Sequence, residues 1–286
     1  MEFFLNFLRS VAYGIIEGVT EWLPISSTGH MILAEQVLKF SFSAEFMEMF
    51  RVVIQLGAIL AVVVLYFKKL WPFCADNGRD SGFSRHFRWP VVRLWCKIIV
   101  ACVPAAVLGL LLDDWLDAHL YNSITVALML IIYGIAFILI ERRPRVPTTT
   151  KLSRITYKQA LIVGAWQVLA LIPGTSRSGS TIIGGLLCGM SRPAASQFTF
   201  FLAIPVMAGA SSLKLVKFLA KGGVFTLAEI SALLAGCIVA FVVSMLAIRF
   251  LMNYVKKHTF TAFGWYRIAL GIVVLGIWAL QTFVLA

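Results

Sequence analysis

The chain has 286 residues, of which 60% are hydrophobic and only 13% are charged, and its formal net charge is +12. A soluble domain carries about 25% charged residues, so this composition excludes an ordinary soluble protein and indicates a single integral membrane domain. The positive charge would suggest nucleic acid as the partner of a soluble protein. Here the cations occur in short loops between apolar segments, as expected for topology signals, so no nucleic acid partner is predicted.

The first apolar region, residues 3–40, is interrupted at residues 17–30 by the polar stretch Glu-Gly-Val-Thr-Glu-Trp-Leu-Pro-Ile-Ser-Ser-Thr-Gly-His. A proline followed by a Ser/Thr/Gly turn leaves backbone groups unpaired, which is tolerated at membrane depth only inside protein or along a wet cavity. The region therefore predicts a re-entrant helix hairpin. Residues 157–192 predict a second one, because they contain Pro-Gly-Thr-Ser-Arg-Ser-Gly-Ser-Thr at 173–181.

The remaining apolar segments predict transmembrane helices. About 20 apolar residues are needed to cross a hydrocarbon layer of about 30 Å. Six segments are long enough, at approximately 47–67, 94–112, 122–140, 197–213, 226–250 and 266–285. The predicted fold is an all-α polytopic membrane protein with six transmembrane helices and two re-entrant hairpins.

The loops between these segments predict an orientation. Loops 68–97 and 141–158 are strongly basic and are expected in the cytoplasm, whereas the acidic turn at 113–120 is expected outside. The charged residues concerned are Lys68, Lys69, Asp76, Arg79, Asp80, Arg85, Arg88, Arg93 and Lys97, then Glu141, Arg142, Arg143, Arg145, Lys151, Arg154 and Lys158, and in the acidic turn Asp113, Asp114 and Asp117. Lys256 and Lys257 fit the same alternation, whereas the group Lys214, Lys217 and Lys221 falls outside, against the rule.

The same order predicts an inverted-topology repeat. Residues 1–150 form a hairpin entered from outside and three spans, and residues 151–286 form a hairpin entered from the cytoplasm and three spans. Pro24 and Pro173 hold matching places in the two halves. In such repeats the broken helices meet near the middle of the membrane, where substrate sites lie.

Glu17 and Glu21 are the first candidate site residues, because they are four residues apart and share one helix face. Two glutamates that simply lie four residues apart on a solvated face are a poor explanation, since the flanking residues are apolar and charge at membrane depth is expensive. Two neighbouring carboxylates need a cation, a shared proton or a divalent metal. Mg²⁺ or Ca²⁺ would suit these oxygen ligands and would bridge to a phosphate.

Ser26, Ser27, Thr28 and His30 follow directly after Pro24. A helix cap explains one hydroxyl, but not three together with an imidazole. Ser27 beside an imidazole is a candidate nucleophile with its base, and His30 could itself attack phosphorus or protonate a leaving group. The residues do not decide between these alternatives.

The second motif is typical of an anion cradle. Gly174 allows a close backbone approach, the following helix offers its N-terminus, and Arg177 supplies a planar fork for a phosphate. Ser176, Ser178 and Thr181 are the candidate hydroxyl donors. The motif lacks the Gly-Lys-Ser/Thr ending of a Walker A loop. Carboxylates, hydroxyls, an imidazole and an anion clamp together fit phosphoryl transfer, and their setting implies a lipid-linked phosphate.

Both motifs, and the run Val-Ile-Gln-Leu-Gly-Ala-Ile-Leu-Ala-Val at 53–62, resemble the undecaprenyl-diphosphate phosphatase family, also known for bacitracin resistance. The resemblance covers essentially the whole chain. It implies hydrolysis of undecaprenyl diphosphate to the monophosphate with a divalent cation, in the bacterial cytoplasmic (inner) membrane, at a site reached from the periplasmic side. It implies the site residues Glu17, Glu21, Ser27, His30, Ser176, Arg177 and Thr181.

A transporter or lipid flippase is the rival interpretation, since inverted repeats and broken helices are transporter features. A protein that only binds a lipid is a weaker alternative, because it has no need of Glu17, Glu21 and His30 together. Besides the polyprenyl diphosphate substrate, the expected partners are membrane lipids. The sequence leaves open a homodimer, the preferred metal and a role in flipping the lipid product.

Overall fold

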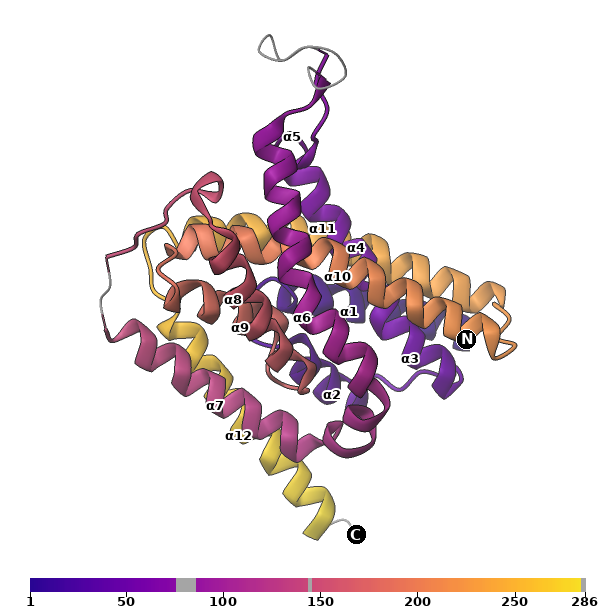
Figure 1. Cartoon of the computed structure of the whole chain (residues 1–286). Coiled ribbons are helices and arrows are strands. Elements are labelled where there is room, and N and C mark those ends of the chain that lie inside the picture. Colours follow the sequence, from indigo (N-terminus) through magenta and orange to yellow (C-terminus); the bar gives the residue numbers. More distant parts are fainter. Residues whose placement is uncertain (76–85, 144–145, 284–286) are drawn as a thin grey trace.

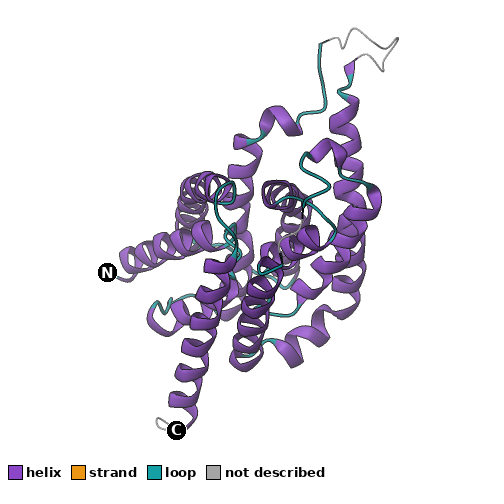
Figure 2. Ribbon diagram, turned by 90° about the vertical axis from the view of Figure 1, so that its left-hand side faces the viewer, coloured by secondary structure: helices purple, strands orange, loops and turns teal. Residues whose placement is uncertain are grey.

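The computed structural model describes residues 1–75, 86–143 and 146–283, with the backbone only at 113, 114 and 117. Over these residues the chain is helical, with two isolated β-bridges and no strand (Figure 2). The helices, labelled in Figure 1, are α1 (Glu2–Thr20), α2 (Ser27–Val37), α3 (Ala44–Val53), α4 (Gln55–Leu65), α5 (Phe67–Leu70), α6 (Trp89–Leu120), α7 (Ser123–Glu141), α8 (Tyr157–Val168), α9 (Arg177–Leu187), α10 (Arg192–Ala220), α11 (Leu227–Tyr254) and α12 (Thr261–Phe283), with short 3₁₀ turns at Leu152–Arg154 and Leu169–Leu171.

Six helical segments are long and apolar enough to cross a membrane, which confirms the predicted all-α polytopic fold. They are Ala44–Leu65, Trp89–Leu112, Ser123–Glu141, Arg192–Ala220, Leu227–Tyr254 and Thr261–Phe283. The turn predicted at 113–120 is wrong, because α6 continues to Leu120. This stretch contains no proline or glycine to stop a helix, and the break comes at Asn122, whose side chain accepts the Thr125 N–H at 2.9 Å and caps α7.

The two regions with polar motifs each fold as a helix–turn–helix hairpin. Helices α2, α8 and α9 have 11 or 12 residues, fewer than the roughly 20 that span a bilayer. In the first hairpin the two ends are joined, since Asn6 Nδ2 donates to Ser41 Oγ at 2.7 Å. In the second, the Thr149 N–H donates to Gly189 O at 3.0 Å, which joins the chain before α8 to the chain after α9. Their re-entrant position in a membrane stays a prediction.

Each hairpin packs against a span of the other half of the chain. Helix α1 packs on α11 and α8 packs on α6, while α7 pairs with α12, and α3 and α4 pair with α10. Glycines allow two of these approaches, because a Cβ on Gly14 would lie 2.6 Å from Gly236 O and one on Gly164 would lie 2.4 Å from Ala101 O. In both cases a hairpin helix from one half of the chain packs on a long helix from the other half. The inverted repeat itself stays a prediction.

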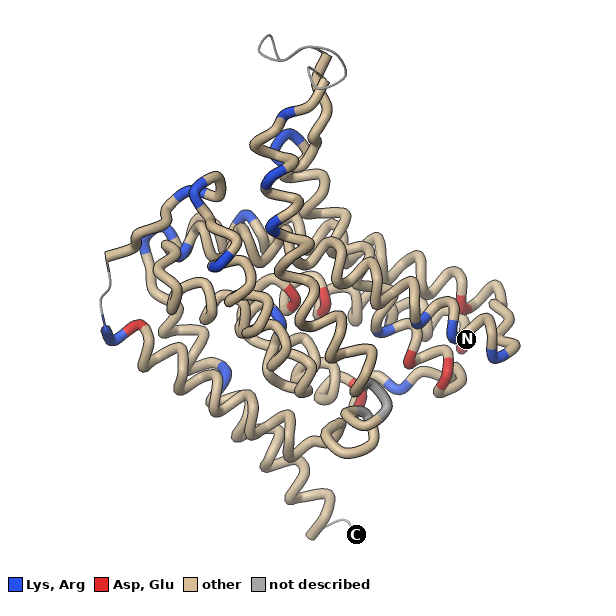
Figure 3. The backbone as a smooth tube through the Cα atoms, viewed as in Figure 1, with Lys and Arg blue, Asp and Glu red and all other residues tan. Residues whose placement is uncertain are grey.

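Most positions of charged residues lie toward the two ends of the bundle, and a few lie near its middle (Figure 3). The basic segments after α5 and α7 lie at the same end of the bundle, near the start of α10. Lys69 at the end of α5 contacts Gln197 of α10 at 3.4 Å, and Glu141 at the end of α7 pairs with Arg192, the first residue of α10, at 2.5 Å. The far end of α10 carries Lys214, which pairs with Glu48 at 2.5 Å. Several residues behind the predicted orientation lie outside the described residues: Asp76, Arg79, Asp80, Arg85, Arg145 and the side chains of Asp113, Asp114 and Asp117.

Candidate active site

Both hairpin turns end in a serine with the same unusual backbone. Ser26 has φ 74° and Ser176 has φ 70°, and these are the non-glycine residues with positive φ in the described chain. Such a conformation is strained for a serine and often marks a functional turn. Each serine caps the next helix, since its Oγ accepts the N–H of Gly29 at 3.4 Å or of Gly179 at 3.2 Å. The first helical residues, Ser27 and Arg177, are therefore presented in equivalent ways.

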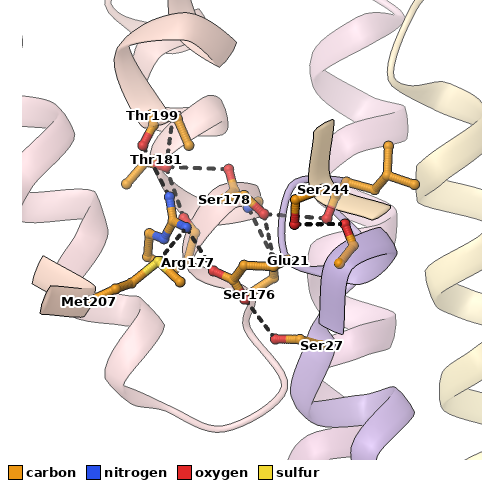
Figure 4. A network of polar contacts seen from close by, with 12 residues as sticks. Glu21, Ser27, Ser176, Arg177, Ser178, Thr181, Thr199, Met207 and Ser244 are labelled. Atoms are coloured by element: carbon orange, nitrogen blue, oxygen red, sulfur yellow. Dashed lines mark hydrogen bonds and ion pairs between the residues drawn. The ribbon is translucent and has the colours of Figure 1, made fainter. Parts of the chain in front are cut away.

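These two residues meet at the carboxylate of Glu21 (Figure 4). Ser27 Oγ donates to Glu21 Oε2 at 2.9 Å, and Arg177 Nη2 donates to Glu21 Oε1 at 2.7 Å. The side chains of Arg177 and Glu21 are only 11% and 9% exposed, so the ion pair is largely removed from solvent. Both predicted motifs thus contribute to one cluster, although they are separated by about half of the chain.

The guanidinium of Arg177 is fixed from several sides. Its Nη1 donates to Thr199 O at 3.0 Å, its Nη2 also contacts Met207 Sδ at 3.2 Å, and the group lies over the Trp22 ring at 5.5 Å from the centroid. Its Nε is buried and has no protein partner. The fork is therefore rigidly placed, with one buried donor available to a ligand.

Glu17 lies one helical turn before Glu21 and is 1% exposed. Its Oε1 has no hydrogen-bond partner in the protein, and its carboxyl group is within electrostatic reach of Glu21 and Arg177. A buried carboxylate oxygen without a partner is costly and points to a missing ligand or proton. Glu17 and Glu21 together present carboxylate oxygen atoms beside the guanidinium of Arg177.

The hydroxyls of the second motif are mostly used within the protein. Ser176 Oγ and Ser178 Oγ lie 3.1 Å apart, and Ser178 Oγ also donates to Leu23 O at 3.3 Å, which joins the two turns. Thr181 is fully buried and donates to Arg177 O at 2.8 Å, while accepting from Thr199 Oγ1 at 2.9 Å. Thr181 therefore helps to hold the backbone of Arg177 and the side chain of Thr199 in place. The predicted substrate contacts of Ser178 and Thr181 stay predictions.

The remaining predicted residues lie around the same turns. Gly174 has φ +89°, and a Cβ there would lie 2.5 Å from Val126 O, so the turn requires glycine. Thr28 is half-buried at the start of α2. The His30 ring is not hydrogen-bonded to Ser27: its Nδ1 is 2.7 Å from Ser26 O and its Nε2 is 2.7 Å from Tyr266 Oη. The group hydrogen-bonded to the Ser27 hydroxyl is the Glu21 carboxylate.

Arg267, which the sequence analysis did not identify, is a fully buried guanidinium that ties the two turns together. Its Nη2 donates to Gly174 O and Thr175 O, both at 2.9 Å, and its Nη1 donates to Pro24 O at 3.3 Å. Further bonds of 3.3 Å and 3.4 Å reach carbonyl oxygens of α7. An arginine inside an apolar helix was the signal that could have found it.

The cluster offers few ligands for a divalent cation. Within the described residues no group of three His, Cys, Asp or Glu side chains could hold a metal ion. Mg²⁺ is commonly held by one or two carboxylates, with phosphate oxygens and water completing the shell. The unpaired Oε1 of Glu17 and the adjacent Glu21 match that smaller donor set. The residues therefore fit a cation shared with a phosphate ligand, and do not fit a cation held by protein alone.

The fold and this cluster define a polytopic helical membrane protein with a buried carboxylate–guanidinium site between two helix hairpins. The family described as Bacitracin resistance protein BacA matches residues 10–273, and the chain belongs to this family. A relative from Enterococcus faecalis is 59% identical over 277 residues, covering 96% of this chain and 98% of that protein. Relatives from Streptococcus gordonii, 54% identical with 98% of both chains covered, and Desulfitobacterium hafniense, 55% identical with 98% and 99% covered, carry the same name, undecaprenyl-diphosphatase.

Proposed function

We infer that this protein hydrolyses undecaprenyl diphosphate to undecaprenyl phosphate and inorganic phosphate. The observation that carries this conclusion is the meeting of Ser27, Glu21 and Arg177 in one buried cluster, in a chain whose relatives are named for that reaction. A hydroxyl, a carboxylate and a guanidinium are the groups that a phosphoryl transfer needs. The reaction would recycle the lipid carrier of cell-wall synthesis, and the family description refers to bacitracin resistance.

The proposed binding mode places the diphosphate at the turn before α9. Arg177 supplies the positive charge, and its buried Nε, which lacks a protein partner, is the donor left for a phosphate oxygen. Ser26, Thr28, Gly174, Ser176, Ser178 and Thr181 are the surrounding groups proposed to bind or shape the substrate. The polyprenyl chain would leave the site into the surrounding lipid, as expected for a cluster between short helices in a membrane domain.

In the proposed reaction, Ser27 Oγ attacks the terminal phosphorus of the diphosphate. The Ser27 proton passes to Glu21, to which the hydroxyl already donates at 2.9 Å. The anhydride P–O bond breaks, undecaprenyl phosphate leaves with the bonding electron pair, and the phosphoryl group remains on Ser27. Water then hydrolyses the phosphoserine ester and restores the hydroxyl. Attack by His30 is the alternative nucleophilic mechanism, and it would leave a phosphohistidine instead.

A divalent cation, Mg²⁺ or Ca²⁺, is proposed to be held by Glu17 and Glu21. When bound, it would neutralise charge on the phosphate and act as a Lewis acid. Support comes from the unpaired buried Oε1 of Glu17 and from the nearby carboxylate of Glu21.

The site is proposed to open toward the periplasmic side of the bacterial cytoplasmic membrane. The resemblance to the phosphatase family implies this opening, and the orientation on which it depends is supported by the basic loops 68–97 and 141–158, which the positive-inside rule assigns to the cytoplasm. A homodimer is a further proposal, to be tested by the mass of the purified protein in detergent.

A phosphate-release assay separates hydrolysis from the transporter alternative. Purified protein in detergent is given undecaprenyl diphosphate, and inorganic phosphate is measured over time. Hydrolysis that disappears in Ser27→Ala, with binding retained, supports the proposed function. A well-folded protein that binds the lipid but releases no phosphate under any divalent cation would make it a transporter or a binding protein.

A further inference from the structure

The imidazole of His30 is held at both nitrogens. Nδ1 lies 2.7 Å from Ser26 O, a neighbour in the same turn, and Nε2 lies 2.7 Å from Tyr266 Oη, which is 236 residues away on α12. The two rings are also stacked, with centroids 5.6 Å apart and planes inclined by only 8°. The position of His30 is therefore set by α12 as much as by its own helix.

The partners of the two nitrogens determine where the proton lies. A backbone carbonyl oxygen can only accept, so Nδ1 must carry the hydrogen that it donates to Ser26 O. In the neutral ring, Nε2 then bears the lone pair, and the Tyr266 hydroxyl is its donor. When Nε2 takes up a proton, the same hydroxyl can rotate and accept it. Both protonation states of His30 are accommodated without moving the ring.

We propose that Tyr266 is a positioning residue for the hydrolysis, holding His30 as the Nδ1–H tautomer and reserving its Nε2 for proton transfer. The proposal rests on the proposed function. It assigns His30 to acid–base chemistry, because Tyr266 can hydrogen-bond to Nε2 with or without a proton, whereas attack on phosphorus would require the nitrogen to leave this hydrogen bond.

The surroundings of Tyr266 fit this role. Tyr266 is 46% exposed, whereas the next residue, Arg267, is fully buried and fixed on the carbonyls of both turns. Arg267 thereby sets the depth and rotation of α12, and the preceding residue is directed at the rim of the site. In the pair His30–Tyr266 the tyrosine is thus partly exposed, whereas the carboxylates of Glu17 and Glu21 are buried.

The first experiment measures the ring nitrogen without using activity. His86, His119 and His258 are replaced by Gln, so that His30 is the only histidine, and its acylation by diethyl pyrocarbonate is followed. The reagent attacks an unprotonated ring nitrogen. Removing the Tyr266 hydroxyl in Tyr266→Phe frees Nε2 while keeping the ring, so acylation should become about threefold to tenfold faster, the equivalent of one hydrogen bond. An unchanged rate overturns the proposal.

The second experiment is a double-mutant cycle on hydrolysis. Tyr266→Phe should lower kcat about tenfold and leave KM within about twofold, since the hydroxyl acts on a catalytic group and not on substrate binding. In a His30→Ala background the same change should have no further effect on kcat. Full additivity of the two changes would mean that Tyr266 acts elsewhere, and would also overturn the proposal.

Tyr254→Phe is the control, because the Tyr254 ring packs edge-on against Phe263, with centroids 5.3 Å apart, and neither ring nitrogen of His30 is bonded to it. It should change neither the His30 acylation rate nor kcat. Should Tyr266→Phe fold poorly, ¹⁵N NMR of the single-histidine protein reports the tautomer with Tyr266 intact. Finding the hydrogen on Nε2 would refute the assignment. The acylation and NMR results stand even if no phosphate is released, so they separate this proposal from the proposed function.

Discussion

The guanidinium of Arg177 donates a 2.7 Å hydrogen bond to the carboxylate of Glu21, although 156 residues separate them. This pair joins the end of α1 in the first hairpin to the start of α9 in the second hairpin, and both side chains are largely buried. Removing one member of such a pair leaves the other as an uncompensated buried charge. Substitutions here must therefore be conservative if they are to report on catalysis.

Arg177→Lys keeps the charge but loses the planar fork. The single nitrogen of a lysine cannot occupy the positions of Nη1, Nη2 and Nε at once, so hydrolysis should fall at least tenfold, about 1.4 kcal/mol of transition-state stabilisation. Steady-state phosphate release measures this. Arg154→Lys, an exposed loop change, is the control. Kinetics of Arg177→Lys close to those of the unaltered protein would rule out a fork-like contact with the substrate.

The identity of the nucleophile predicts a trapped intermediate. If Ser27 attacks phosphorus, acid quenching during turnover of ³²P-labelled substrate should give an acid-stable phosphoserine at position 27. In a parallel alkaline quench, label that is retained on His30 and lost on acidification would instead establish the histidine as nucleophile. Ser27→Ala should show no label and should lose activity by about a hundredfold or more, the scale of a lost nucleophile or acid–base group.

The carboxylate pair predicts dependence on a divalent cation. Excess chelator should abolish hydrolysis, and added Mg²⁺ or Ca²⁺ should restore it. Glu17→Gln and Glu21→Gln keep the shape but remove charge, so both should raise the cation concentration needed for half-maximal activity. Glu45→Gln, at an exposed position, should not. Full activity in chelator together with a loss in Glu21→Gln would favour a proton-transfer role and exclude the metal bridge.

The orientation predicts opposite labelling of two exposed lysine positions. In a background without the native cysteines, Lys151→Cys should resist an impermeant thiol reagent in intact cells, and Lys221→Cys should react. The two positions lie in segments at opposite ends of the bundle (Figure 1). Labelling of position 151 from outside would reverse the topology.

Arg267 predicts a loss of stability. Arg267→Lys keeps a buried charge but cannot reach the carbonyls of Pro24, Gly174 and Thr175 together. Each lost hydrogen bond to a charged group costs about 1.5–3 kcal/mol, so the unfolding temperature in detergent should drop clearly, and activity should drop with it. Arg249→Lys, an exposed change on α11, serves for comparison. An unaltered unfolding temperature would show that the hydrogen bonds of Arg267 to the two turns do not stabilise the fold.

The sequence predicted the six spans, the two broken regions and most residues of the cluster, because apolar runs and buried charge are visible without coordinates. It could not show that Ser27 bonds to Glu21 while His30 turns to Tyr266, since both outcomes fit the same spacing on one short helix. Arg267 was missed because the last span was predicted to start at 266, which put the arginine at a helix end. The helix begins at Thr261, so Arg267 lies well inside it.

The matching turns were predicted only approximately. Pro24 and Pro173 were proposed as equivalent, whereas the residues with matching backbone are Ser26 and Ser176, whose left-handed conformation no residue type signals in sequence. Counted from these serines, the two prolines are one position out of register. The two turns are equivalent in the capping serines that precede Ser27 and Arg177, and not in the prolines that break the helices.

The contacts of Arg267 have a consequence for the synthesis of the protein. Both motifs leave the ribosome well before residue 267, so a growing chain holds the carbonyls of Pro24, Gly174 and Thr175 without the guanidinium that gathers them. The guanidinium of Arg267 reaches the two turns only when α12 enters the membrane. Nascent protein would thus carry every catalytic side chain and still be inactive, and the last insertion step would switch it on.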